Sequence, residues 1–288
     1  MQLSRHQQVA FVGLIVGGLA IALSPIFVRL SEVGPTATAF WRVALAFPAA
    51  LLLAVGEGRG MWPRTSKEAG LCALAGLSFA GDLITWHWSI HYTSVTNATL
   101  FANAAPIIVT LGGWLLFGQR FSLTFLAGMA LALGGAAILV GVSVNLGGTA
   151  LMGDGLALTT ALFYAGYFLA VKHLRATLST GAVMLWTTLG TSLAVLPIAL
   201  VSEPMLAPPT LWGWAVVAGL ALVSHAGGQG LIAWALASLP AAFSSVTLLI
   251  QPLAAALLAW VLLGEALSAV QIAGGLVLLL GIYVARRG

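Results

Sequence analysis

Asp82 is the residue whose type and position most clearly suggest chemistry. It is an acidic side chain near the middle of the apolar stretch 69–91, and Ser78, Trp86 and Ser89 recur at helical spacing around it. A charged side chain in hydrocarbon costs on the order of 2.5–3.5 kcal/mol by insertion scales, so it usually faces a cavity or a partner. We expect Asp82, with Ser78 and Trp86, to bind a substrate ammonium group or to exchange protons. The alternative is a structural hydrogen bond to a neighbouring helix.

Arg42 is the matching basic residue. It lies seven residues into the apolar stretch 35–55, which is roughly 10 Å deep at the rise of an α-helix. We expect it to hold a substrate carboxylate or to pair with Asp82, and the two charges together would suit a zwitterion. The alternatives are snorkelling to the membrane interface or a packing role.

His225 and Gln229 form a second polar pair, four residues apart in the apolar stretch 211–236, so a helix would place them on one face. Three of the four residues 227–230 are glycines, which weaken a helix and predict close backbone approach or local unwinding. The pair is a candidate for substrate binding. The alternative is a hydrogen-bonded buried histidine beside a tight helix crossing.

Two prolines mark candidate hinges. Asn103 shortly precedes Pro106, and Gln251 directly precedes Pro252, each pair within an apolar stretch. A proline inside a helix frees a carbonyl one turn earlier and can kink the helix. We expect Asn103 and Gln251 to contact substrate and the prolines to act as gating hinges. The alternative is a static kink whose freed backbone groups are satisfied by polar side chains.

Aromatic side chains fall at depths where they could line a cavity. They are Trp41, Trp86, Phe163, Tyr164, Tyr167 and Trp186. Their rings could stack on an aromatic substrate or bind an ammonium group by cation–π contact. The alternative for each ring is a place in the core or against lipid.

The amino-acid composition indicates whether the helices that position these residues lie in water or in a membrane. Of 288 residues, 60% are hydrophobic and 6% are charged, with 7 acidic and 11 basic side chains, and the mean hydropathy is +1.06. Soluble domains carry about 25% charged residues. The chain therefore cannot cover a water-facing surface, which excludes a soluble enzyme, a disordered protein and a nucleic-acid binder. We expect an all-α membrane protein.

Ten apolar stretches are long enough to cross the bilayer, which takes about 20 residues. They are 9–28, 35–55, 69–91, 96–117, 122–142, 153–172, 180–201, 211–236, 241–263 and 268–285. The short breaks between them predict an antiparallel helical bundle. The first stretch is too long for the apolar region of a signal peptide and no cleavage motif follows it, so we expect a retained helix.

Basic residues predict the orientation. If the N-terminus is cytoplasmic, alternation places the following residues on the cytoplasmic side: Arg5, Arg59, Arg64, Lys67, Arg120, Lys172, Arg175, Arg286 and Arg287. Only Arg29 falls outside, which is a strong positive-inside bias. Both termini are then cytoplasmic. The single cysteine, Cys72, excludes a disulfide framework.

The sequence contains an internal repeat at an offset of 146 residues. Residues 106–135 align without gaps on 252–281, and ten of the thirty positions are identical, among them paired Pro, Trp and Ser residues. A repeat of five helices is odd-numbered, so the second copy enters the membrane from the opposite side. This predicts two inverted-topology five-helix repeats, 1–142 and 153–288, with a cavity near the midplane between them.

Several motifs resemble the EamA type of the drug/metabolite transporter superfamily. They are Tyr92-Thr93-Ser94, Leu115–Gln119, Gln251-Pro252, Leu262–Glu265, Ser24-Pro25 and Phe40-Trp41-Arg42. The resemblance covers essentially the whole chain and implies export or exchange of small metabolites across a bacterial inner membrane. The aromatic-rich helices look most like the YddG-type amino-acid exporters. One departure is Gly118-Gln119-Arg120 where the family commonly has Gly-Glu-Arg.

These observations lead to one expected function and its rivals. We expect an alternating-access exporter of small amphipathic metabolites, above all amino acids including aromatic ones, driven by the substrate gradient or by protons. The rivals are a transporter of drugs, nucleosides or sugars on the same fold, a membrane-embedded enzyme, and a non-transporting scaffold. The sequence has no catalytic constellation and no phosphate-binding loop, and His225 falls on a different helix from His87 and His91. We expect the protein to need no cofactor and no metal. Its expected partners are the lipid bilayer and a small-molecule substrate, and we expect it to be a monomer.

Overall fold

The computed structural model describes residues 4–58, 60–93, 95–141, 149–263 and 267–288. Every regular element among these residues is helical. The elements are α1 (Arg5–Ala22), α2 (Ser24–Leu30), α3 (Pro35–Ala44), α4 (Phe47–Glu57), α5 (Ser66–Tyr92), α6 (Val95–Ala102), α7 (Ala105–Phe117), α8 (Leu123–Val140), α9 (Thr149–Leu174), α10 (Thr180–Ser202), α11 (Leu211–Gly219), the π-helix η1 (Leu220–Gln229), α12 (Gly230–Ala235), α13 (Ala241–Thr247), α14 (Ile250–Leu263) and α15 (Ala269–Arg287).

These elements make ten helices that are long and apolar enough to span a membrane. Within the described chain they cover Arg5–Leu30, Pro35–Glu57, Ser66–Ser89, Ala98–Phe117, Leu123–Val140, Thr149–Leu174, Thr180–Ser202, Leu211–Ala235, Ala241–Leu258 and Ala269–Arg287. The ten predicted stretches are confirmed to within a few residues at most ends. Of the residues that carried predictions, Arg59, Ser94 and Gly264–Ala266 lie outside the described residues.

Several spans consist of two segments because a proline interrupts the helix. α6 ends at Ala102 and α7 resumes with Pro106 in second place, while α13 ends at Thr247 and α14 resumes just before Pro252. Pro25 and Pro48 likewise stand at the starts of α2 and α4. The missing N–H and the fixed φ of proline suit the first turn of a helix and not its interior. The helices are thus broken where the sequence predicts kinks, and a hinge role for the breaks stays a prediction.

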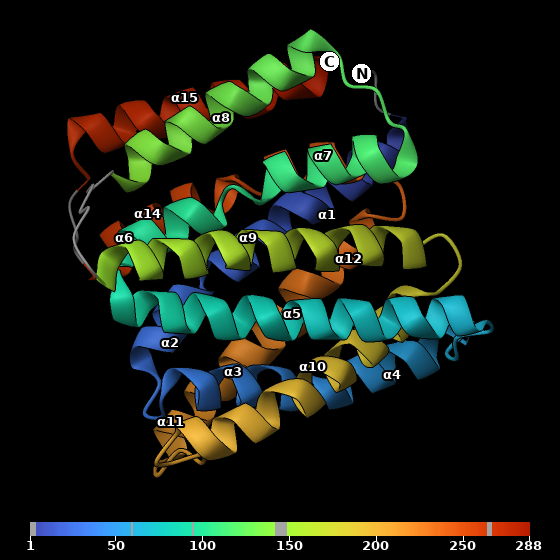
Figure 1. Cartoon of the computed structure of the whole chain (residues 1–288), viewed down its shortest axis with the longest axis vertical. Coiled ribbons are helices and arrows are strands. Elements are labelled where there is room, and N and C mark those ends of the chain that lie inside the picture. The colour runs from blue at the N-terminus through green and yellow to red at the C-terminus, as the bar shows by residue number, and fades with distance from the viewer. Residues whose placement is uncertain (1–3, 59, 94, 142–148, 264–266) are drawn as a thin grey trace.

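The tight crossing of α8 and α15 shows the relation between the two halves. The two helices lie side by side in Figure 1. A β-carbon at Gly128 would lie 2.8 Å from the carbonyl oxygen of Gly281, and one at Gly135 would lie 2.8 Å from that of Gly274. Gly128 and Gly274 are repeat mates at the offset of 146, as are Gly135 and Gly281. Gly128 therefore contacts Gly281, the repeat mate of Gly135, and Gly135 contacts Gly274, the repeat mate of Gly128. A two-fold axis between the halves requires this exchange.

Two glutamates follow the same symmetry. Glu57, at the end of α4, accepts a hydrogen bond from the backbone N–H of Gly181 at the start of α10 (2.7 Å). Glu203, its mate at the offset of 146, follows α10 and accepts one from the N–H of Thr36 at the start of α3 (2.7 Å). The carboxylates satisfy N–H groups that a helix start leaves without intrahelical partners. The predicted inverted repeat is confirmed by this reciprocal pairing.

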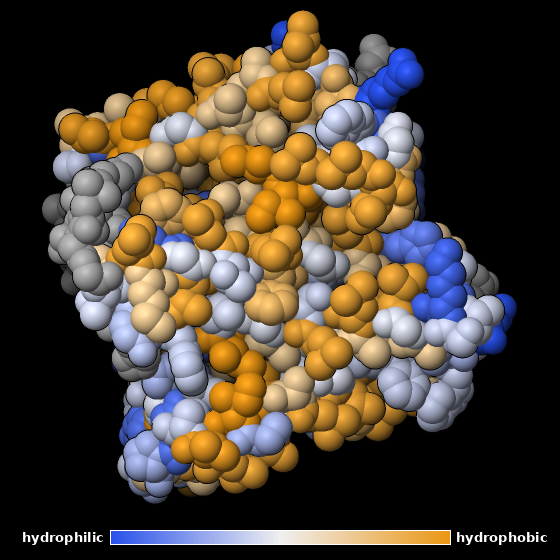
Figure 2. Space-filling view, in the orientation of Figure 1, coloured by the Kyte–Doolittle hydropathy of each residue, from blue (hydrophilic) through white to orange (hydrophobic). Residues whose placement is uncertain are grey.

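The two ends of the chain lie at the same end of the bundle. The guanidinium carbon of Arg286 is 5.2 Å from the ring centroid of Phe11, and Figure 1 places N and C at one corner. We call this end of the bundle, which carries Arg5, Arg120 and Lys172, the termini face. In Figure 2 an apolar band crosses the middle of the molecule and hydrophilic residues gather at its edges, as expected of a membrane-spanning bundle.

Candidate functional site

A cavity of about 200 Å³ lies where the broken helices meet. Its wall is formed by residues from α1, α2, α3, α5, α6, α7, α9, η1, α13 and α14. Pockets for drug-sized ligands usually measure roughly 300–1,000 Å³, so this cavity suits a smaller molecule. Pro106 and Pro252, the predicted hinges, both contribute to its lining.

Two charged side chains line the cavity, the buried Arg42 and the half-buried Asp82, and we call this pair the charged wall. Arg42 projects from α3 and Asp82 from α5, and both line the cavity. The guanidinium carbon of Arg42 is 5.7 Å from the ring centroid of Phe79, one helical turn before Asp82. Phe79 is itself held against Tyr167 of α9, with ring centroids 4.8 Å apart. This packing holds the Arg42 side chain in the cavity lining, and its Nε has no hydrogen-bond partner within the described residues.

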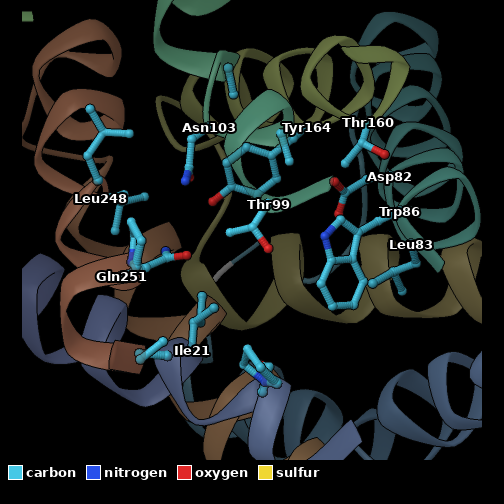
Figure 3. A pocket seen from close by; sticks show the side chains of 18 of the residues that line it. Ile21, Asp82, Leu83, Trp86, Thr99, Asn103, Thr160, Tyr164, Leu248 and Gln251 are labelled. Atoms are coloured by element: carbon cyan, nitrogen blue, oxygen red, sulfur yellow. The ribbon is translucent and has the colours of Figure 1, made fainter. Parts of the chain in front are cut away.

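The charged wall continues along α5 and α9. Trp86 follows Asp82 by one turn, and Tyr164 and Thr160 reach the cavity from α9 (Figure 3). The hydroxyl groups of Thr85 and Thr160 are 2.7 Å apart and join the two helices. A carboxylate, a guanidinium group and two aromatic rings thus border the same space.

Several buried polar atoms on the cavity wall have no hydrogen-bond partner within the described residues. They are Ser24 Oγ, Arg42 Nε, Asn103 Nδ2 and Gln229 Oε1. An unpaired buried polar group costs about 1–3 kcal/mol, and natural proteins leave few of them. A polar ligand in the cavity would satisfy these unpaired donors and acceptors.

The predicted irregularity beside Gln229 takes the form of a π-helix. η1 spans Leu220–Gln229 inside the span that α11 and α12 complete. A β-carbon at Gly228 would lie 3.1 Å from the carbonyl oxygen of Gly17 on α1, so the glycine permits a close helix approach. π-helical turns are rare and are frequent at functional sites. Here the segment carries Gln229 into the cavity lining.

Two predicted tryptophans lie away from the cavity, near the ends of their helices. Trp41 donates from Nε1 to the carbonyl oxygen of Leu206 (2.7 Å). Trp186 donates from Nε1 to the carbonyl oxygen of Met61 (2.8 Å). Both indoles anchor a loop to a helix end, a position that suits amphipathic rings at a membrane interface.

The remaining predicted side chains pack in the core outside the cavity lining. Tyr167 packs against Phe79 with the two rings tilted, and Phe163 covers Gly81 of α5. Ser78 faces Gly166, where an added β-carbon would lie 3.2 Å from the serine hydroxyl.

His225 lies beside the cavity but does not line it. Its Nε2 is 3.0 Å from the hydroxyl oxygen of Thr188 on α10, and its ring centroid is 5.4 Å from that of Phe79. The imidazole is 2% exposed. Its Nδ1 has no hydrogen-bond partner within the described residues, and a role of His225 in substrate binding stays a prediction.

Ser24, Thr99, Thr160 and Ser245 line the cavity but were missed as site residues. Thr160 precedes Tyr164 by one helical turn, so extending the aromatic face of α9 backwards would have found it. Ser24 stands directly before Pro25, at the helix break. A search for small polar residues at such breaks would have found it.

Within the described chain, the spans, the two-fold related halves and the polar cavity between them define a membrane transporter built from inverted repeats. Residues 8–141 and 151–287 each match the EamA-like transporter family. The chain therefore belongs to the EamA-like transporter family, whose members are transporters and not enzymes.

Solved structures agree on the fold. One crystal structure superposes with a TM-score of 0.84 over 97% of this chain and 97% of its own, at 17% sequence identity. A likeness at this identity concerns the fold alone. A search of curated proteins found none that matches.

Proposed function

We propose that the protein exports small zwitterionic metabolites, above all amino acids including aromatic ones, across a bacterial inner membrane by alternating access. The observation that carries the proposal is that Arg42 and Asp82 both line the same small cavity. An arginine can hold a carboxylate with two parallel hydrogen bonds, and a carboxylate can hold an ammonium group. The α-carbon of an amino acid presents both groups within a few ångströms of each other.

The size and rings of the cavity support the same substrate class. About 200 Å³ excludes large amphipathic drugs. Trp86 and Tyr164 border the charged wall, where they could stack on an aromatic side chain or face an ammonium group. The sequence resemblance to YddG-type exporters points in this direction as well.

The direction and energy source of transport form part of the proposal. The basic residues of the termini face, such as Arg120 and Lys172, favour a cytoplasmic position for both termini. The charged groups would be neutralised by substrate while the two halves rock about their two-fold axis. Either the substrate gradient or protons exchanged by Asp82 would drive the cycle, and a monomer suffices because the cavity lies within one chain.

The test is uptake of radiolabelled substrates by proteoliposomes that contain the purified protein, with amino acids, nucleosides, sugars and cationic drugs as competitors. We expect amino acids to compete. We expect Arg42→Met to raise the half-saturation concentration at least tenfold, because a hydrogen bond to a charged group contributes about 1.5–3 kcal/mol. Arg42→Lys should retain part of the affinity.

Arg120→Met is the matched control, because this arginine is exposed on the termini face. It should transport as the unmodified protein does. Competition by nucleosides, sugars or drugs and by no amino acid would overturn the proposed substrate class. Unchanged half-saturation in Arg42→Met would remove the arginine from the binding site.

A further inference from the structure

The cavity has a second polar wall that a zwitterionic head group does not use. Asn103, at the break between α6 and α7, and Gln251, near the start of α14, lie on the side opposite Asp82 and Trp86 (Figure 3). We call Asn103 and Gln251 the amide wall. Its side chains are neutral, in contrast to the charged wall formed by Arg42 and Asp82.

The amide wall is built to meet a ligand. Asn103 Nδ2 is buried and has no hydrogen-bond partner within the described residues, and the same holds for Ser24 Oγ elsewhere in the cavity lining. The asparagine nitrogen therefore does not donate a hydrogen bond to a free backbone carbonyl at the helix break. In a membrane interior such groups are costly and normally face a cavity or a partner. A hydrogen-bonding group on the substrate would satisfy them.

The surroundings of these polar groups restrict what that substrate group can be. Ile21, Leu248 and Ala102 line the cavity as well and offer an apolar surface to methylene groups. The amide wall has no charged side chain to balance a second charge on the substrate. A neutral amide or hydroxyl group, which donates and accepts hydrogen bonds, fits this wall better than a carboxylate, an ammonium group or a hydrocarbon.

We propose that the amide wall selects zwitterions whose side chain carries a neutral hydrogen-bonding group over their apolar isosteres. This inference rests on the proposed function, which supplies the zwitterionic head group at Arg42 and Asp82. An apolar side chain would leave Asn103 Nδ2 buried and unpaired in the complex. Sites that hydrogen-bond a substrate group discriminate strongly against analogues that lack it, for the same reason.

The test is competition by isosteric pairs in the proteoliposome assay: glutamine against methionine, threonine against valine, and tyrosine against phenylalanine. We expect the polar member of each pair to compete at a concentration roughly tenfold to a hundredfold lower. Asn103→Leu should narrow the ratio for glutamine against methionine to less than threefold. Gln119→Leu, which changes an exposed carboxamide outside the cavity, should leave the ratio unchanged.

The outcomes separate this proposal from the one on which it rests. Equal competition within all three pairs by the unmodified protein would overturn the selection by the amide wall and leave amino-acid transport intact. Competition by no amino acid would overturn both. The comparison within pairs uses the unmodified protein, so it decides the matter even where Asn103→Leu fails to fold.

Discussion

Replacing Lys172 with methionine should open the cavity toward the termini face. Lys172 Nζ donates hydrogen bonds to the carbonyl oxygens of Leu236 (2.8 Å) and Leu239 (3.0 Å), which follow the C-terminal end of α12. Arg175 Nε adds a hydrogen bond to the carbonyl oxygen of Ala233 (3.0 Å). Both cations satisfy carbonyl groups at a helix C-terminus, where the helix dipole also favours them. They tie α12 and the connection after it to the end of α9.

The position of the cavity leads us to expect that these contacts close it on the side of the termini face. Val28 lies near the end of α2 and Thr99 near the start of α6, and both helix ends belong to the face opposite the termini. Because both residues line the cavity, it extends from the middle of the bundle toward that opposite face. Under the alternating-access mechanism proposed above, we expect the contacts of Lys172 to break when the cavity opens to the termini face.

The expected size of the effect follows from the two hydrogen bonds. Each is a hydrogen bond from a charged donor, which contributes about 1.5 kcal/mol at the low end, so their loss amounts to about 3 kcal/mol. Since about 1.4 kcal/mol corresponds to a factor of ten, the ratio of the two open states should shift roughly 150-fold toward the termini face. Methionine keeps the length and apolar stem of lysine and removes the donors.

Accessibility of a cysteine in the cavity measures the shift. Ser245 lines the cavity and lies four residues into α13, which starts at the termini face. In a Cys72→Ser background, Ser245→Cys should react faster with a membrane-impermeant maleimide added from that side when Lys172→Met is present. Lys67→Met, which alters an exposed lysine of the same face, is the matched control. The labelling rate of Ser245→Cys is compared alone, with Lys172→Met and with Lys67→Met. Equally slow labelling in these three proteins would refute the reasoning.

Three further outcomes are expected. Asp82→Asn should abolish the pH dependence of uptake if protons drive transport, and unchanged rates and pH profile would remove Asp82 from coupling. Gly281→Leu should lower the unfolding temperature in detergent, because a β-carbon there would lie 2.2 Å from a backbone nitrogen of α8 and overpacking costs about 1–3 kcal/mol; Gly134→Leu, at an open position, should not. Glu203→Ala should cost about 1 kcal/mol by removing the acceptor for the N–H of Thr36, and an unchanged unfolding midpoint would contradict that.

The local chemistry of the sequence determines the spans and their symmetry. Burial in hydrocarbon depends on the hydropathy of about 20 consecutive residues, so the ten helices follow from composition alone. The offset of 146 residues predicts which positions correspond. The structure then brings Gly128 to Gly281. It also brings Glu57 to the start of α10, the helix that is followed by Glu203, the repeat mate of Glu57. Pro106 and Pro252 fix the helix breaks because a proline acts on its own backbone.

The tertiary structure decides which polar and aromatic side chains share the cavity. Asp82 and Tyr164 face it, whereas Tyr167 and His225 pack just beside it, because the rotation of each helix about its axis is set by packing against neighbours far away in the sequence. Lys172 shows the same limit. Its sequence position predicts a membrane face, but its carbonyl partners at Leu236 and Leu239 belong to a helix end more than sixty residues later, and no local pattern encodes that distance.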